Sequence, residues 1–161
     1  MNKETASKII NYINKEIEKN SFDSFFITLF GGEPFTDFNS ITYPLLSKIK
    51  TLIEKAGKYF SCFFVTNASL IDEEIINKLK YLNPHLQITL DGDKEHHDKV
   101  RIWKQGNKPT YDHILWVIRR TRQTLWRGGA DANPKTCCQT IHDCQKVVPL
   151  HYESEWQYKH V

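Results

Sequence analysis

The chain has 161 residues, which allows one domain with a sizeable core and leaves little room for a second. Hydrophobic residues make up 40% and charged residues 25%, so the composition is that of a folded globular protein and excludes a disordered one. The net charge of +3 is too small and too evenly spread to indicate a nucleic-acid partner. No apolar run reaches the roughly 18 residues of a membrane span, and the first residues lack a secretory signal. We therefore expect a cytoplasmic protein without a membrane partner.

Helical and strand patterns alternate along the first three quarters of the chain. Apolar residues at helical spacing predict an amphipathic helix over about 5–20. The aromatic and β-branched run 25–30 predicts a strand that is covered on both faces in a parallel sheet. The further predicted helices cover residues 41–57, 71–79 and 110–118, and the further predicted strands cover 60–66 and 86–90.

This order of elements predicts an α/β fold, in which βα units form a parallel sheet with outer helices, either open or as part of a barrel. In such folds, ligands bind beyond the carboxyl ends of the strands. Three short segments follow predicted strands, at residues 31–34, 66–67 and 89–92. We expect all three on one rim of the sheet.

The first of these segments is Gly31-Gly32-Glu33-Pro34. Two glycines after a strand permit positive φ and a close approach of the backbone to a ligand, and Pro34 fixes the direction of the chain beyond them. Glu33 would project a carboxylate from the rim, which suits an ammonium group. A tight turn with a solvated Glu33 is the alternative that these four residues alone leave open.

Three stretches together resemble the radical S-adenosylmethionine (radical SAM) enzymes, in particular the anaerobic sulfatase-maturating enzymes and the SPASM-type peptide maturases. The stretches are 27–35 (ITLFGGEPF), 65–70 (VTNASL) and 87–101 (QITLDGDKEHHDKVR). The resemblance runs from about residue 3 to 120 and implies part of a (β/α)6 partial TIM barrel. Residues 1–125 would supply its strands two to four.

The resemblance also implies a set of residues that bind S-adenosylmethionine (SAM). In this family, the loop at the position of Gly31, Gly32 and Glu33 binds the amino group of SAM, and the hydroxyl at the position of Thr89 lies near the carboxylate. Arg101 would pair with that carboxylate, because a guanidinium forms paired charge-assisted hydrogen bonds. Asn67 would face the same cavity, with an alanine after it where the family has glycine. The implied cofactor-binding residues are Gly31, Gly32, Glu33, Pro34, Asn67, Thr89 and Arg101.

The [4Fe-4S] cluster of the family is held by Cys-x3-Cys-x2-Cys, and this sequence lacks that motif. The cysteines and histidines near the end of the chain do not reproduce the spacing, so we predict no metal site from them. They are Cys137, Cys138, His142, Cys144 and His151. Cys62 lies inside a predicted strand and is expected to be a small core residue.

The missing motif and an abrupt change in composition suggest a fragment. Tryptophan, arginine and cysteine concentrate late in the chain, and periodicity fades beyond Leu125. We therefore expect a tail of uncertain fold over 126–161, through a reading-frame change near Leu125, and an internal start near Met1. Complete relatives would reductively cleave SAM to a 5'-deoxyadenosyl radical that modifies a peptide or protein side chain. The unpaired sheet edges of a fragment would favour self-association.

Two other functions stay open from the residues alone. The chain could be a remnant that binds SAM or a peptide without a cluster and without catalysis. It could also be a βα domain that binds a nucleotide or phosphate, with Gly31 and Gly32 near a helix N-terminus. Glu33 argues against the latter, because a fixed carboxylate repels phosphate.

Three further groups of residues could be interpreted as functional, but we expect each of them to have a structural role. His96, His97 and Asp98 are interpreted as part of a solvated, charge-rich loop from Asp91 to Arg101. Asp91 is interpreted as a turn former at a strand end. The aromatic residues of and before the first strand are expected in the core; they are Phe22, Phe25, Phe26 and Phe30.

Overall fold

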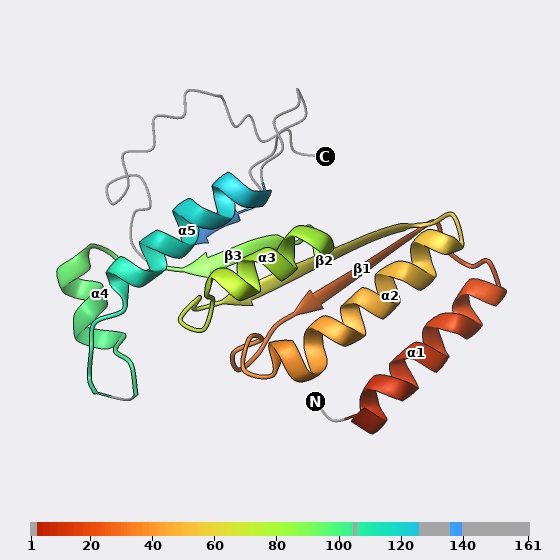
Figure 1. Cartoon of the computed structure of the whole chain (residues 1–161), viewed down its shortest axis with the longest axis horizontal. Coiled ribbons are helices and arrows are strands. Elements are labelled where there is room, and N and C mark those ends of the chain that lie inside the picture. Colours follow the sequence, from red (N-terminus) through yellow and green to blue (C-terminus); the bar gives the residue numbers. More distant parts are fainter. Residues whose placement is uncertain (1–2, 105, 126–135, 140–161) are drawn as a thin grey trace, which may run out of the picture.

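The structure, a computed structural model, describes residues 3–104, 106–125 and 136–139. Its elements alternate along the chain as the sequence predicts (Figure 1). The helices are α1 (Lys3–Glu18), the π-helix η1 (Phe38–Thr42), α2 (Tyr43–Lys55), α3 (Glu73–Leu82), α4 (Lys94–Val100) and α5 (Tyr111–Leu125). The strands are β1 (Ser24–Leu29), β2 (Tyr59–Thr66), β3 (His85–Thr89) and β4 (Thr136–Gln139).

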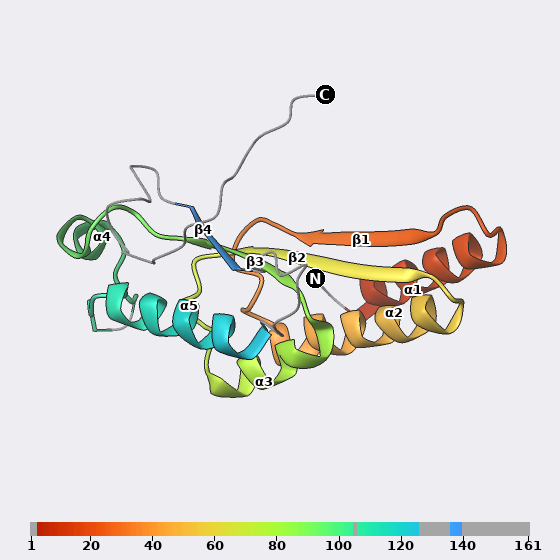
Figure 2. The same ribbon diagram turned by 90° about the horizontal axis from the view of Figure 1, so that it is seen from above.

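The strands form one parallel sheet in the order β1-β2-β3-β4. Leu29 pairs with Phe64, and Thr66 pairs with Ile88, so the carboxyl ends of β1, β2 and β3 lie at one rim. Helices α1, α2, α3 and α5 lie on one side of the sheet (Figure 2). This is the α/β architecture of a parallel sheet with outer helices.

The core fills the layer between the sheet and the helices. Alternate residues of β2 point into this layer and are buried, among them Phe60, Cys62 and Phe64. They pack against apolar residues at helical spacing, such as Ile49 and Ile53 of α2, which are fully buried. The expectation that Cys62 is a core residue is confirmed, since its exposed fraction is 1%.

The opposite face of the sheet is where the prediction for the first strand is wrong. Phe26 and Phe30, expected in the core, are 70% and 79% exposed, whereas Phe25 and Phe22 are half-buried against the core. In β1, exposed and half-buried residues alternate, because the helices cover only one face. Among the described residues, the apolar run 25–30 is therefore not covered on both faces of the sheet.

The loop predicted from Asp91 to Arg101 is also wrong, because residues 94–100 form α4 beyond the carboxyl end of β3 (Figure 1). Asp93 caps this helix, since its side chain accepts a hydrogen bond from the backbone N–H of His96 at 2.9 Å. Of the predicted tail over 126–161, the structure describes only β4, which pairs with β3. The remaining residues of that prediction, with His142, Cys144 and His151, lie outside the described residues.

Candidate functional site at the carboxyl rim

The site begins where β1 ends. Gly31 and Gly32 have φ values of +93° and +55°, a region that residues with a Cβ rarely adopt. Both are exposed, and a Cβ at either position would meet no atom within 4 Å. The glycines are thus required by backbone conformation, and the space beside their backbone is open to a ligand.

The chain turns at Gly31 and Gly32 and places the half-buried Glu33 at the end of β2. Its Oε1 accepts a hydrogen bond from Thr66 Oγ1 at 2.6 Å and from the backbone N–H of Phe35 at 3.3 Å. Its Oε2 accepts from the backbone N–H of Asn67 at 3.0 Å. Glu33 is therefore held by donors from β2 and from its own loop, and the alternative of a solvated carboxylate in a tight turn does not describe it.

The segment after β2 is shaped by two short side-chain turns. Thr66 Oγ1 accepts from the backbone N–H of Ala68 at 2.9 Å, and Asn67 Oδ1 accepts from that of Ser69 at 2.8 Å. Ala68 is fully buried with a φ of +60°, a conformation that glycine adopts more readily. These turns direct both the hydroxyl of Thr66 and the N–H of Asn67 at Glu33.

Below the glycine loop lies a cluster of buried aromatic rings. Phe35 stacks on Phe64 of β2 with ring centroids 5.1 Å apart, and its centroid is 5.0 Å from that of Phe38 in η1. The exposed fractions of these three residues are 3%, 0% and 1%. Packing of this kind ties the loop to the sheet, so the position of Glu33 is coupled to the core.

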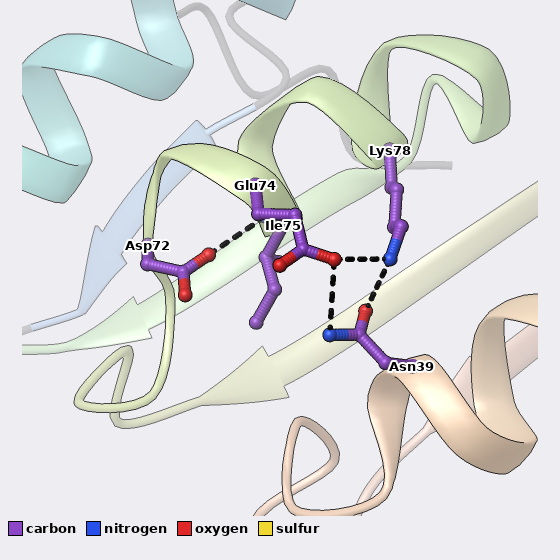
Figure 3. Close-up of polar contacts among 5 residues, drawn as sticks. All are labelled: Asn39, Asp72, Glu74, Ile75 and Lys78. Carbon is purple, nitrogen blue, oxygen red and sulfur yellow. Dashed lines mark hydrogen bonds and ion pairs between the residues drawn. The ribbon is translucent and has the colours of Figure 1, made fainter.

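A polar cluster ties η1 to α3 at the surface (Figure 3). Asn39 Nδ2 donates to Glu74 Oε1 at 3.4 Å, and Lys78 Nζ donates to Asn39 Oδ1 at 2.9 Å and to Glu74 Oε1 at 2.5 Å. Asp72 accepts from the N–H of Ile75 and caps α3 beside the cluster. Exposed pairs like these stabilise weakly, so they supplement the aromatic packing.

A hollow of about 330 Å³ opens beside the end of β1. Glu33 and Gly31 line it together with Phe30, Pro34 and Asp37. This volume is at the lower end of the range of small-molecule sites, roughly 300–1,000 Å³. The structure thus brings the predicted residues Gly31, Glu33 and Pro34 to one concave surface.

The predicted residues Thr89 and Arg101 lie further along the same rim. Thr89 is the last residue of β3 and is half-buried. Arg101 follows α4, and its Nε–H donates to Asp91 Oδ2. Within the part of the chain that the structure describes, this pairing uses Nε and not the terminal amino groups of Arg101. The contacts that join Glu33 to Thr66 and Asn67 do not extend to Thr89 or Arg101 among the described residues.

Asp91 and His97 were interpreted as a turn former and part of a solvated loop, and both are buried, with exposed fractions of 8% and 0%. His97 Nδ1 accepts from the N–H of Asp91 at 3.1 Å, and His97 Nε2 lies 3.0 Å from Thr110 Oγ1. Asp98 Oδ1 accepts from the N–H of Thr110 and ties α4 to α5. Burial lowers the pKa of His97, which the carboxylates of Asp91 and Asp98 partly oppose. The imidazole therefore links Asp91, which follows β3, to Thr110, which precedes α5.

The described residues can be tested against the two groups that the resemblance implies. The open backbone at Gly31 and the carboxylate of Glu33 have the chemistry to bind an ammonium group, and the guanidinium of Arg101 has the chemistry to bind a carboxylate. The residues that the structure describes contain no group of three or more possible metal-ligating side chains, so they offer no site for an iron-sulfur cluster. Within the same residues, no helix is long and apolar enough to span a membrane.

Known proteins share both the sequence pattern and the fold. The chain is 33% identical over 125 residues to the uncharacterized protein MJ0907 of Methanocaldococcus jannaschii, covering 74% of this chain and 39% of that protein. It is also similar to the solved structure of native anSMEcpe, an anaerobic sulfatase-maturating enzyme, with bound AdoMet and the Kp18Cys peptide, with a TM-score of 0.65 and 16% identity. That match covers 87% of this chain and 34% of anSMEcpe.

A second structure of anSMEcpe, with AdoMet and the Cp18Cys peptide, matches with the same TM-score of 0.65 and the same 16% identity. This likeness supports the interpretation of the sheet as part of a partial TIM barrel. The chain thus spans between a third and two fifths of the relatives it matches. The Radical SAM superfamily pattern matches residues 2–128, which is most of the chain. The chain therefore belongs to the radical SAM superfamily.

Proposed function

We propose that this chain binds SAM at the carboxyl rim of its sheet, as part of an enzyme that modifies a peptide or protein side chain. The observation that carries the proposal is the position of Glu33. Its carboxylate is held in place beside two glycines whose backbone is open, at a hollow of about 330 Å³. A fixed negative charge next to uncrowded backbone groups suits the ammonium group of an amino-acid ligand.

The other predicted residues complete the set of contacts. The terminal amino groups of Arg101 would pair with the ligand carboxylate, and the hydroxyl of Thr89 would donate to the same group. Asn67 would face the ligand from the end of β2, and Pro34 would direct the chain away from it. Peptide modification is supported by the peptide-bound structures of anSMEcpe that share this fold.

The reaction of the family needs a [4Fe-4S] cluster, which supplies the electron for cleavage of SAM. The described residues do not hold such a cluster, so the proposal for this chain stops at binding. A remnant that binds SAM without catalysis therefore remains compatible with the same site. A nucleotide-binding function is disfavoured, because the carboxylate of Glu33 would repel phosphate from the glycine loop.

Equilibrium dialysis of the full chain with radiolabelled SAM tests the proposal. We expect saturable binding that weakens by about tenfold or more in Glu33→Gln, since a charged hydrogen bond is worth about 1.5–3 kcal/mol. Glu54→Gln is the matched control, because Glu54 is an exposed residue near the carboxyl end of α2, paired with Lys50. It should bind SAM as the unaltered chain does.

Either of two results would overturn the proposal. One is an absence of SAM binding by the unaltered chain, and the other is equal binding by Glu33→Gln. Dialysis with ATP tests the nucleotide alternative, which predicts that Glu33→Gln strengthens ATP binding by removing the repulsive charge.

A further inference from the structure

The hydrogen bonds to Glu33 leave its two oxygens in different states. A carboxylate offers about four acceptor positions, two on each oxygen. Oε1 uses both of its positions, for Thr66 Oγ1 at 2.6 Å and for the N–H of Phe35 at 3.3 Å. Oε2 uses one, for the N–H of Asn67 at 3.0 Å. With respect to the described residues, one acceptor position therefore stays open, and it is on Oε2.

The direction of the Thr66 hydroxyl is fixed by a second hydrogen bond. Its oxygen accepts from the N–H of Ala68 at 2.9 Å, so the N–H occupies one lone pair and the single hydroxyl proton points to Glu33. Thr66 is the last residue of β2 and is 3% exposed. Bulk water therefore does not compete effectively for this hydroxyl.

We propose that Thr66 is a positioning residue, which fixes the carboxylate of Glu33 so that Oε2 meets the cationic group of the ligand. This inference rests on the proposed SAM binding and deepens it. Without the hydroxyl, Oε1 loses its shortest hydrogen bond, and the carboxylate can rotate away from the N–H of Asn67. The charge of Glu33 would remain, but its orientation toward the ligand would not.

The inference differs from a merely structural role of Thr66 in its dependence on the ligand. A structural defect would weaken the binding of any ligand at the rim. A positioning defect weakens the binding of SAM, which has an ammonium group. It does not weaken the binding of 5'-methylthioadenosine, which lacks the amino-acid part. The effect of a Thr66 substitution on SAM binding also disappears when Glu33 has already been replaced, because the two residues then no longer act together.

The test is dialysis of the full chain with both ligands, for Thr66→Val, Thr66→Ser and the double variant Thr66→Val, Glu33→Gln. We expect Thr66→Val to bind SAM about tenfold more weakly and Thr66→Ser to bind within about threefold of the unaltered chain. Methylthioadenosine binding should not change. In the Glu33→Gln background, Thr66→Val should have no further effect on SAM.

Two controls keep the comparison sharp. Thr121→Val makes the same substitution at a fully buried threonine, whose hydroxyl bonds to the carbonyl groups of Val117 and Ile118 in α5, and it should leave SAM binding unchanged. Near-UV circular dichroism shows whether each variant is folded. If Thr66→Val does not fold, Thr66→Cys replaces it, because a thiol is a weaker donor of similar size. We expect Thr66→Cys to bind SAM more weakly than Thr66→Ser, by up to about tenfold relative to the unaltered chain.

Amide hydrogen exchange at Asn67 separates failure of this inference from failure of the proposed function. Loss of the Thr66 hydroxyl should speed exchange at Asn67 by about tenfold without ligand, because Glu33 no longer holds that N–H. Faster exchange in a chain that does not bind SAM would refute SAM binding and leave the positioning role intact. Unchanged exchange, or unchanged SAM binding by folded Thr66→Val, would overturn the positioning role.

Discussion

Substitution of Phe35 tests whether the aromatic cluster below the glycine loop holds that loop on the sheet. Phe35 is 3% exposed and contacts the rings of Phe64 and Phe38. Truncation of such a residue to alanine costs about 3–5 kcal/mol. Phe35→Leu retains much of the apolar volume but loses two ring pairs, each worth about 0.5–1.5 kcal/mol, so we expect a loss of about 1–3 kcal/mol.

Urea unfolding followed by circular dichroism at 222 nm measures both free energies. With a slope of about 2 kcal/mol per molar urea, Phe35→Ala should lower the midpoint by about 1.5–2.5 M. Phe26→Ala is the matched control, since Phe26 is 70% exposed on the open face and has a ring pair with Tyr59, so its removal should cost only about 0.5–1.5 kcal/mol. A midpoint for Phe35→Ala equal to that of Phe26→Ala would refute the reasoning.

Three further predictions follow from the structure. Burial lowers the pKa of His97, so the unfolded chain takes up the proton first as the pH falls. The free energy of unfolding, measured in urea titrations, should therefore decrease as the pH falls from about 7.5 to 5.5. His97→Gln should show a smaller decrease, whereas His96→Gln, a substitution at an exposed site, should show the full decrease. Ala68→Gly should stay within about 1 kcal/mol of the unaltered chain in the same assay, because relief of the left-handed conformation offsets the lost methyl, and Ala68→Val should lose more than about 2 kcal/mol. The uncharged strand β1, with Phe26 exposed in it and Phe30 exposed just after it, should cause self-association that light scattering detects and that Phe26→Lys reduces. A monomer at all concentrations would contradict this.

Most of the fold could be predicted because helix and strand periods differ clearly in this chain. The predicted strand 60–66 is β2 from Tyr59 to Thr66, and the predicted start of the last helix near 110 is that of α5 at Tyr111. The sequence pattern did not predict helix α4, because its buried side chain, His97, is polar and its apolar residue Val100 is 60% exposed. The cap at Asp93 was the available signal. The exposure of Phe26 escaped because a run of apolar residues does not show which faces of a sheet are covered.

The site was predicted as a set of residues, but not as a set of contacts. Glycines after a strand and a following glutamate indicated the rim, and the positive φ values of Gly31 and Gly32 agree with the backbone conformation expected there. The sequence could not show that Glu33 bonds to Thr66, because that contact joins residues 33 positions apart. It also could not show that Arg101 pairs with Asp91, a contact that depends on the path of α4. Side-chain partners follow from tertiary structure rather than from local pattern.

SAM binding at the rim beside Glu33 is the central claim for this chain. The direct measurement is a titration of the ¹⁵N-labelled chain with SAM, followed through its backbone amide signals. We predict that the signals of Gly31, Gly32, Glu33 and Asn67 shift with a common saturation curve, and that Glu33→Gln moves this curve to SAM concentrations about tenfold higher or more. Shifts confined to other parts of the chain, or no shifts at saturating SAM, would contradict it.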